Sequence, residues 1–150
     1  MTNDRALLKI AVPNKGALSE AAAAMLTEAG YRMRWDSRDL VLLDEANGVE
    51  FYYLRPRDIA VYVGEGTLDL GITGRDMLLD SGAEADEVMA LGFGGTRFRF
   101  AAPGGASWTL ADLNGKRIAC SYPGLLRAYL DARIQQHVSA GDAQIEGALP

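Results

Sequence analysis

The chain of 150 residues has one cysteine, Cys120, and one histidine, His137. A single cysteine cannot form a disulfide within the chain, which is typical of a reducing compartment. Nothing in the sequence places His137 beside Cys120 as a nucleophile pair. Cys120 is more typical of a small buried core residue, and His137 of a surface residue. We therefore expect a reduced, cytoplasmic, globular protein.

Long apolar runs and an excess of basic charge are also lacking. No stretch approaches the roughly 18 apolar residues of a membrane-spanning helix, and the first residues predict no secretory signal. Lys and Arg number 15 against 20 Asp and Glu, a net charge of −5. This balance argues against nucleic acid as the main partner. A phosphorylated small molecule remains compatible, because a few focused cations outweigh a mildly acidic exterior.

Several catalytic motifs are absent. The sequence contains no P-loop, no G-x-S-x-G, no H-E-x-x-H and no paired C-x-x-C. Gly92-Phe93-Gly94-Gly95 leads to Arg97, so the third glycine of a dinucleotide fingerprint is missing. Apolar residues at 49% and charged residues at 23% are average for globular proteins, which excludes a disordered chain.

The sequence contains instead an alternation of strand-like and helix-like segments. Helices are predicted from residue 17 to a cap at Gly30, from Pro56, from Gly74 and from Tyr122-Pro123, with a capped helical turn at 108–112. An Asn-Gly pair predicts a hairpin between the second and third strands. The predicted strands are residues 7–13, 39–44, 49–54, 68–73, 88–92, 96–103, 116–121 and 143–149.

This alternation predicts an α/β fold with mainly parallel sheets. The Gly94-Gly95 break suggests two lobes, residues 1–95 and 96–150. Ligands of such sheets bind beyond the carboxyl ends of the strands. The turns predicted at such ends are Asn14-Lys15-Gly16, Arg55-Pro56-Arg57-Asp58, Thr73-Gly74-Arg75-Asp76 and Ser121-Tyr122-Pro123.

Each candidate also has a plain structural interpretation. Lys15 and Gly16 could hold a phosphate at a helix N-terminus, or could form an ordinary turn with a solvated lysine. Asp69 lies in a strand predicted to be buried, where it could accept hydrogen bonds from a ribose or could pair with an arginine. Arg55 and Arg57 both suit phosphate oxygens, and only one of them is expected to point inward.

Five segments occur in an order that closely resembles the ATP phosphoribosyltransferase family, which opens histidine biosynthesis. They are IAVPNKGALSE, VEFYYLRPRDIAVYV, LDLGITGRDML, LGFGGTRFRFAAP and LNGKRIACSYPGLLRAYL. The resemblance implies a two-lobed fold like that of type II periplasmic binding proteins, with the active site between the lobes. It also implies that adenine N1 of ATP attacks the ribose C1 of phosphoribosyl pyrophosphate (PRPP), with Mg²⁺ required and pyrophosphate released.

The resemblance assigns roles to particular residues. Arg55 would face the phosphates and stabilise the leaving group. The resemblance also implies further substrate-binding positions, with nucleotide contacts in the first lobe and PRPP contacts in the second. They are Lys15, Gly16, Arg38, Asp69, Thr73, Tyr122 and Pro123. No metal ligands are carried over, and a homo-oligomer, a dimer or a hexamer, is expected.

Family members continue past Pro150 into a Gly/Thr-rich loop that binds the PRPP phosphates. We therefore expect this chain to be a shortened transferase that has no turnover alone and self-associates through uncovered apolar surface. The alternative is a nucleotide-binding or regulatory lobe completed by a partner chain. A solute-binding protein of similar fold is disfavoured by the LRPRD string and the missing signal sequence.

Overall fold

The computed structural model describes residues 6–139, without the side chains of 136–139, so the strand predicted at 143–149 lies outside the described residues. The chain divides into two compact units, Met1–Gly95 and Thr96–Pro150, which are described separately below. No helix among the described residues is both long and apolar enough to cross a membrane.

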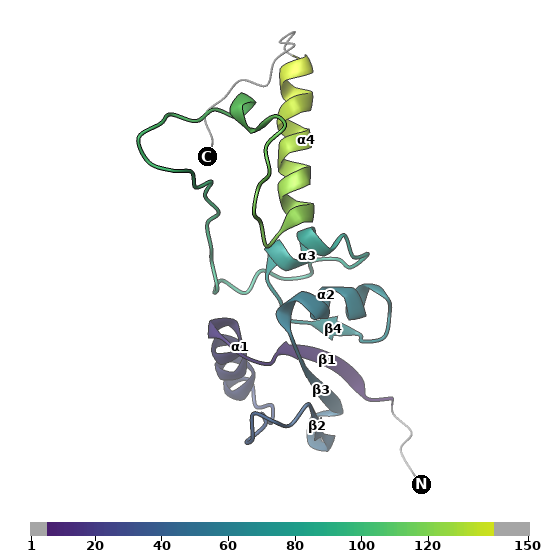
Figure 1. The fold of residues 1–150 in the computed structure, drawn as a ribbon. Helices are drawn as coiled ribbons and strands as arrows, with labels where there is room; N and C mark the ends of the chain where they lie inside the picture. The colour runs from purple at the N-terminus through teal and green to yellow at the C-terminus, as the bar shows by residue number, and fades with distance from the viewer. Residues whose placement is uncertain (1–5, 140–150) are drawn as a thin grey trace. The chain divides into compact units, whose positions relative to one another are not determined.

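The first unit is built on a four-stranded sheet in the order β2-β3-β1-β4 (Figure 1). The central strand β1 runs parallel to β3 on one side and to β4 on the other. The strand β2 pairs antiparallel with β3, which confirms the predicted hairpin. The sheet is therefore mixed and mostly parallel, as the apolar strand runs indicate. The bounds are β1 Leu8–Pro13, β2 Val41–Asp44, β3 Val49–Leu54 and β4 Leu70–Gly71.

Helices cover both faces of this sheet (Figure 1). Alternate residues of β1 and β3, with Phe51 at the centre, pack on α1 (Ala17–Glu28). Ala11 faces the other way and packs against Ile59 of α2 (Pro56–Gly64). The third helix, α3 (Arg75–Ser81), lies against α2. The central strand is thus buried on both faces, which explains its short continuous apolar run.

Local signals set where these elements begin and end. The predicted cap at Gly30 is confirmed, because Gly30 has φ 92° and its N–H donates to the Thr27 carbonyl while Tyr31 N–H donates to that of Leu26. Pro56 begins α2 as predicted. Residues 45–47 form a short 3₁₀ helix, η1 (Glu45–Asn47), that joins β2 to β3 and ends at Gly48, whose φ is 67°.

The second unit contains η2 (Ala111–Leu113) and α4 (Pro123–Ser139). The acid half of the predicted capping box before η2 is present, since the backbone N–H and the hydroxyl of Thr109 both donate to Asp112, at 2.7 and 2.9 Å. The N-cap residue of η2 is Leu110, which has no side-chain cap. The start of α4 at Pro123 is also as predicted.

Three predicted strands, 88–92, 96–103 and 116–121, are wrong, and the one at 68–73 shrinks to the two residues of β4. Val88 and Met89 are exposed and pair with no strand of the described chain. In the second unit, Phe98 packs edge-on against Tyr122, with ring centroids 5.0 Å apart. Local alternation predicted strands here, but a strand also needs a pairing partner, which local pattern does not supply.

We expect Gly71→Ala to destabilise the first unit. A Cβ at this position would overlap Cγ2 of Ile59 and lie 3.1 Å from Cγ2 of Val63, so α2 would have to move away from β4. Overpacking of this kind costs about 1–3 kcal/mol. Urea denaturation measures the loss, and Gly95→Ala, where a Cβ meets nothing within 4 Å, is the matched control. Equal effects of the two substitutions would contradict the packing argument.

Asp44 gives a pH-dependent prediction. This buried carboxylate accepts hydrogen bonds from the backbone N–H of Arg32 and from the backbone and side chain of Asn47. These donors lower the pKa of Asp44 below the ordinary 3.8, and the backbone N–H of Arg32 contributes most. The stabilisation is therefore present at neutral pH and is lost as pH falls through the folded-state pKa. Asp44→Asn should lower the urea midpoint at pH 7, and the difference from the unaltered chain should shrink below pH 3.8. A difference that stays constant with pH would contradict the assignment.

Candidate functional site

The carboxyl ends of β1, β3 and β4 lie at one edge of the sheet, because these strands run parallel. The turns that begin α1, α2 and α3 follow those ends. The antiparallel strand β2 begins at the same edge, where Tyr53 N–H donates to the Leu40 carbonyl at 2.8 Å. We call this edge the carboxyl edge. Five of the predicted site residues belong to its turns, namely Lys15, Gly16, Arg38, Arg55 and Thr73.

The chain changes direction at this edge. The helix after β1 covers one face of the sheet, whereas the helix after each neighbouring strand lies on the other face (Figure 1). Such a point is a topological switch point, and ligands of open α/β sheets bind there. The sequence predicted that these turns share an edge. The strand order adds that the turn after β1 lies at the switch point itself.

The turn after β1 presents backbone donors and a cation. Asn14 N–H donates to the Leu54 carbonyl at 2.9 Å, which fixes the turn to the end of β3. Gly16 has φ 84°, a conformation that favours glycine, and α1 begins directly after it without a side-chain cap. The side chain of Lys15 is exposed and forms no ion pair with a described residue.

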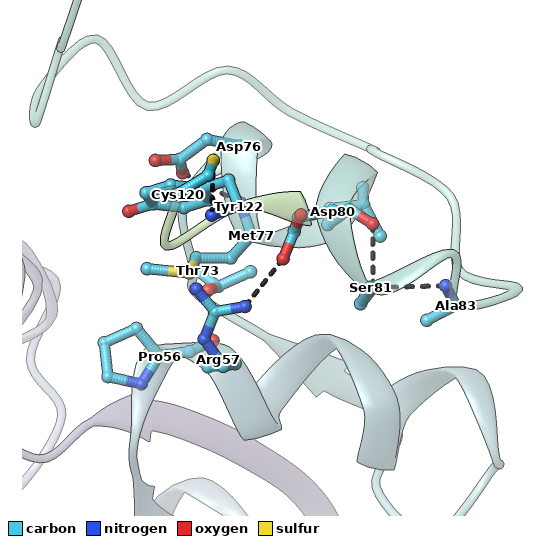
Figure 2. A network of polar contacts seen from close by, with 11 residues as sticks. Pro56, Arg57, Thr73, Asp76, Met77, Asp80, Ser81, Ala83, Cys120 and Tyr122 are labelled. Atoms are coloured by element: carbon cyan, nitrogen blue, oxygen red, sulfur yellow. Dashed lines mark hydrogen bonds and ion pairs between the residues drawn. The ribbon is translucent and has the colours of Figure 1, made fainter. Parts of the chain in front are cut away.

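The two arginines of the next turn have different surroundings. Arg57 on α2 donates to Asp80 of α3 at 2.6 Å, and the Asp80 side chain is only 5% exposed (Figure 2). Arg55 precedes α2, is 72% exposed and donates to Asp58 at 2.8 Å. Arg57 therefore holds two helices together, while Arg55 remains accessible at a helix N-terminus.

Thr73 connects the turn after β4 to the turn after β3. Its hydroxyl donates to the Pro56 carbonyl at 2.7 Å, and the side chain is half-buried (Figure 2). The hydroxyl proton is thus engaged within the protein, so Thr73 fixes the spacing between these two turns.

Arg38 lies in the segment that leads to β2. Its guanidinium is exposed and forms a two-pronged ion pair with Asp36, at 2.6 Å for the shortest contact. The Arg38 side chain lowers the pKa of Asp36, which stays ionised at neutral pH.

Sequence reasoning missed Arg34, which is half-buried at the same edge. Its guanidinium carbon lies 4.1 Å from the ring centroid of Tyr53, and its nitrogens donate to backbone carbonyls of Asn14, Ser37 and Asp39. No local pattern distinguishes Arg34 from Arg32, and only the position of Tyr53 in β3 reveals the contact.

Asp69 is placed differently from the other predicted residues. It precedes β4, is exposed rather than buried, and accepts a hydrogen bond from Lys9 N–H at 2.9 Å. The sequence also allowed Asp69 to pair with an arginine, but no such ion pair is found among the described residues. Asp69 precedes and Thr73 follows the two residues of β4, and four residues of extended chain span about 13 Å, so Asp69 lies toward the opposite edge of the sheet.

The remaining predicted residues belong to the second unit. Pro123 begins α4, and the Tyr122 carbonyl accepts from Leu126 N–H at 3.0 Å. Cys120 is exposed, which contradicts its predicted place in a buried strand, because that strand does not form. His137 is predicted to lie at the surface, but its side chain lies outside the described residues.

Within residues 6–139, no three His, Cys, Asp or Glu side chains gather in a group that could hold a metal ion.

Comparison with known proteins gives one consistent result. A family model described as "HisG: ATP phosphoribosyltransferase" matches residues 55–149. Proteins named ATP phosphoribosyltransferase from Pseudarthrobacter chlorophenolicus and Kocuria rhizophila are 58% and 61% identical over 143 residues, which is 95% of this chain. The chain covers 49% and 50% of those relatives, so it spans about half their length.

A solved structure shares the fold. The "ATP phosphoribosyl transferase (HisG:HisZ) complex from Thermotoga maritima" superposes with a TM-score of 0.57 at 23% sequence identity. The match covers 84% of this chain and 59% of that one. At this identity the likeness concerns the α/β fold alone.

The two arginines predict a stability test. Arg57→Met removes the cation that contacts a buried carboxylate, so we expect it to cost about 1–3 kcal/mol in the free energy of unfolding. Arg55→Met breaks an exposed pair and should cost about 0–1 kcal/mol. Urea denaturation of both variants measures the difference. A larger loss for Arg55→Met would contradict the structural assignment of Arg57.

Proposed function

Because this chain belongs to the ATP phosphoribosyltransferase family, whose model matches well over half of its length, we propose that its carboxyl edge binds the phosphates of ATP and PRPP. The observation that carries the proposal is the gathering of Lys15, Arg38 and Arg55 in the turns of this edge, around a switch point. The reaction joins adenine N1 to the ribose C1 of PRPP as the bond from C1 to the pyrophosphate oxygen breaks.

Arg55 is proposed to stabilise the leaving pyrophosphate. Negative charge builds on that group as the bond to C1 breaks, and an arginine fork donates to two phosphate oxygens at once. The present partner of Arg55 is Asp58, in an exposed pair, and such pairs contribute about 0–1 kcal/mol. Phosphate oxygens can therefore replace Asp58 at small cost.

Lys15 and Gly16 are proposed to bind phosphate through the ammonium group and the backbone N–H groups at the start of α1. Arg38 adds a second cation, whose exposed pair with Asp36 is equally replaceable. Thr73 is proposed to hold the turns at their spacing. Asp69, Tyr122 and Pro123 remain predicted substrate contacts that rest on the family resemblance.

Mg²⁺ stays a proposal of the resemblance. Among residues 6–139, no three His, Cys, Asp or Glu side chains gather to hold it. Mg²⁺ commonly binds substrate phosphates and keeps several waters, so it is proposed to arrive with ATP and PRPP.

The larger assembly is proposed on the same ground. The two units would form periplasmic-binding-protein-like lobes, with the nucleotide on the first and PRPP on the second, in a cytoplasmic homo-oligomer. The alternative is a nucleotide-binding or regulatory lobe completed by a partner chain, and the two-component name of the Thermotoga complex favours testing it. Co-purification with a partner that restores turnover would select the alternative.

Calorimetric titration of ATP into the whole chain tests the proposal. We expect saturable binding that Lys15→Ala and Arg55→Met each weaken on the order of tenfold, which corresponds to about 1.4 kcal/mol. Lys9→Ala is the matched control, because Lys9 is an exposed lysine at the amino end of the same strand. Absent binding, or equal losses for Lys9→Ala and Lys15→Ala, would contradict a phosphate site at the carboxyl edge.

A further inference from the structure

We propose that Arg34 is a positioning residue for the phosphate-binding edge, because it ties the segment that carries Arg38 to the carboxyl end of β1. This inference rests on the function proposed above. It goes beyond the residues that the family resemblance singles out, and it follows from one set of contacts within the first unit.

The guanidinium of Arg34 joins three backbone carbonyls. One terminal nitrogen, Nη1, donates to the carbonyls of Ser37 and Asp39, both at 2.8 Å. The other, Nη2, donates to the carbonyl of Asn14. Ser37 and Asp39 are the two sequence neighbours of Arg38, and Asn14 immediately precedes Lys15. One planar group thus links two of the proposed phosphate-binding cations.

Tyr53 fixes Arg34 itself to the sheet. The guanidinium carbon of Arg34 lies 4.1 Å from the centroid of the Tyr53 ring. The Tyr53 hydroxyl accepts a hydrogen bond from the backbone N–H of Arg34 at 3.0 Å. Tyr53 is buried in β3. Arg34 is therefore anchored in the core of the unit, and its hydrogen bonds fix the exposed segment around Arg38 relative to the sheet.

The hydrogen-bond partners of Arg34 are neutral carbonyls, although its positive charge also helps to lower the pKa of the nearby Asp36. Among residues 6–139 Arg34 forms no ion pair, since its donors are directed at carbonyls. Its charge therefore adds to the positive field at the carboxyl edge. Lysine would retain this charge, but its single ammonium group cannot reproduce a planar fork that reaches three carbonyls.

A double-mutant cycle with Arg34→Lys and Arg38→Ala, read by ATP titration into the whole chain, tests the link. We expect Arg34→Lys to weaken ATP binding about tenfold when Arg38 is present and less than about twofold in Arg38→Ala, because residues joined through one hydrogen-bond network couple. Arg32→Lys, a change two residues earlier at an exposed position, should have no effect in either background. Additive losses in the cycle would overturn the proposal.

Hydrogen exchange provides a readout that does not depend on ATP. The Asp39 amide donates to the Asp36 carbonyl at 3.1 Å, and its exchange should become about tenfold faster in Arg34→Lys but not in Arg32→Lys. Unchanged exchange would overturn the proposal whatever the titration shows. If the unaltered chain binds no ATP, the proposed function is wrong. Faster exchange of the Asp39 amide in Arg34→Lys would then still show that Arg34 holds the segment around Arg38 in place.

Discussion

The central strand β1 is hydrogen-bonded on both sides and packed on both faces, and this double burial constrains the rest of the first unit. Parallel pairing with β3 and β4 brings three strand ends to one edge. Alternate side chains of β1 point to opposite faces of the sheet, so that α1 packs on one face and α2 on the other. This arrangement creates the switch point. Ala11 and Gly71 are small where α2 approaches, and this lets the helix lie close to the sheet.

Charge at the carboxyl edge follows from how each cation is partnered. The chain carries a net charge of −5, yet among the described residues Arg38 and Arg55 pair with half-buried carboxylates a few residues away. Exchanging such a partner for phosphate costs little, because water already screens the pair. Arg57 contacts a buried carboxylate and cannot be released in the same way. The burial of the acid partner, more than the arginine itself, thus distinguishes the arginines proposed to bind phosphate from the structural one.

The sequence predicted those features whose causes are local. Gly30, Pro56 and the Asn-Gly hairpin each act through the backbone within a few residues, and the structure confirms them. The strand predicted at 116–121 failed because pairing is not local, and the expected burial of Cys120 failed with it. Residue patterns alone left Arg55 and Arg57 open, and only the family resemblance favoured Arg55. The pairing of Arg57 with Asp80, more than twenty residues away, depends on the fold. Arg34 was missed for the same reason, because its contacts depend on Tyr53.

Asp69 and Thr73 belong to one segment, which includes β4, but they lie toward opposite edges of the sheet. Only two residues of β4 pair with β1 in the ladder, so the strand has little backbone pairing to hold its register. Asp69 extends this pairing, since its carboxylate accepts from Lys9 N–H while its own N–H donates to the Lys9 carbonyl at 3.0 Å. Farther along, Ile72 N–H donates to the Ala11 carbonyl. A strand fixed at both ends delivers Thr73 to the carboxyl edge in one register. Asp69 therefore acts on that edge through the backbone, from the other end of the strand.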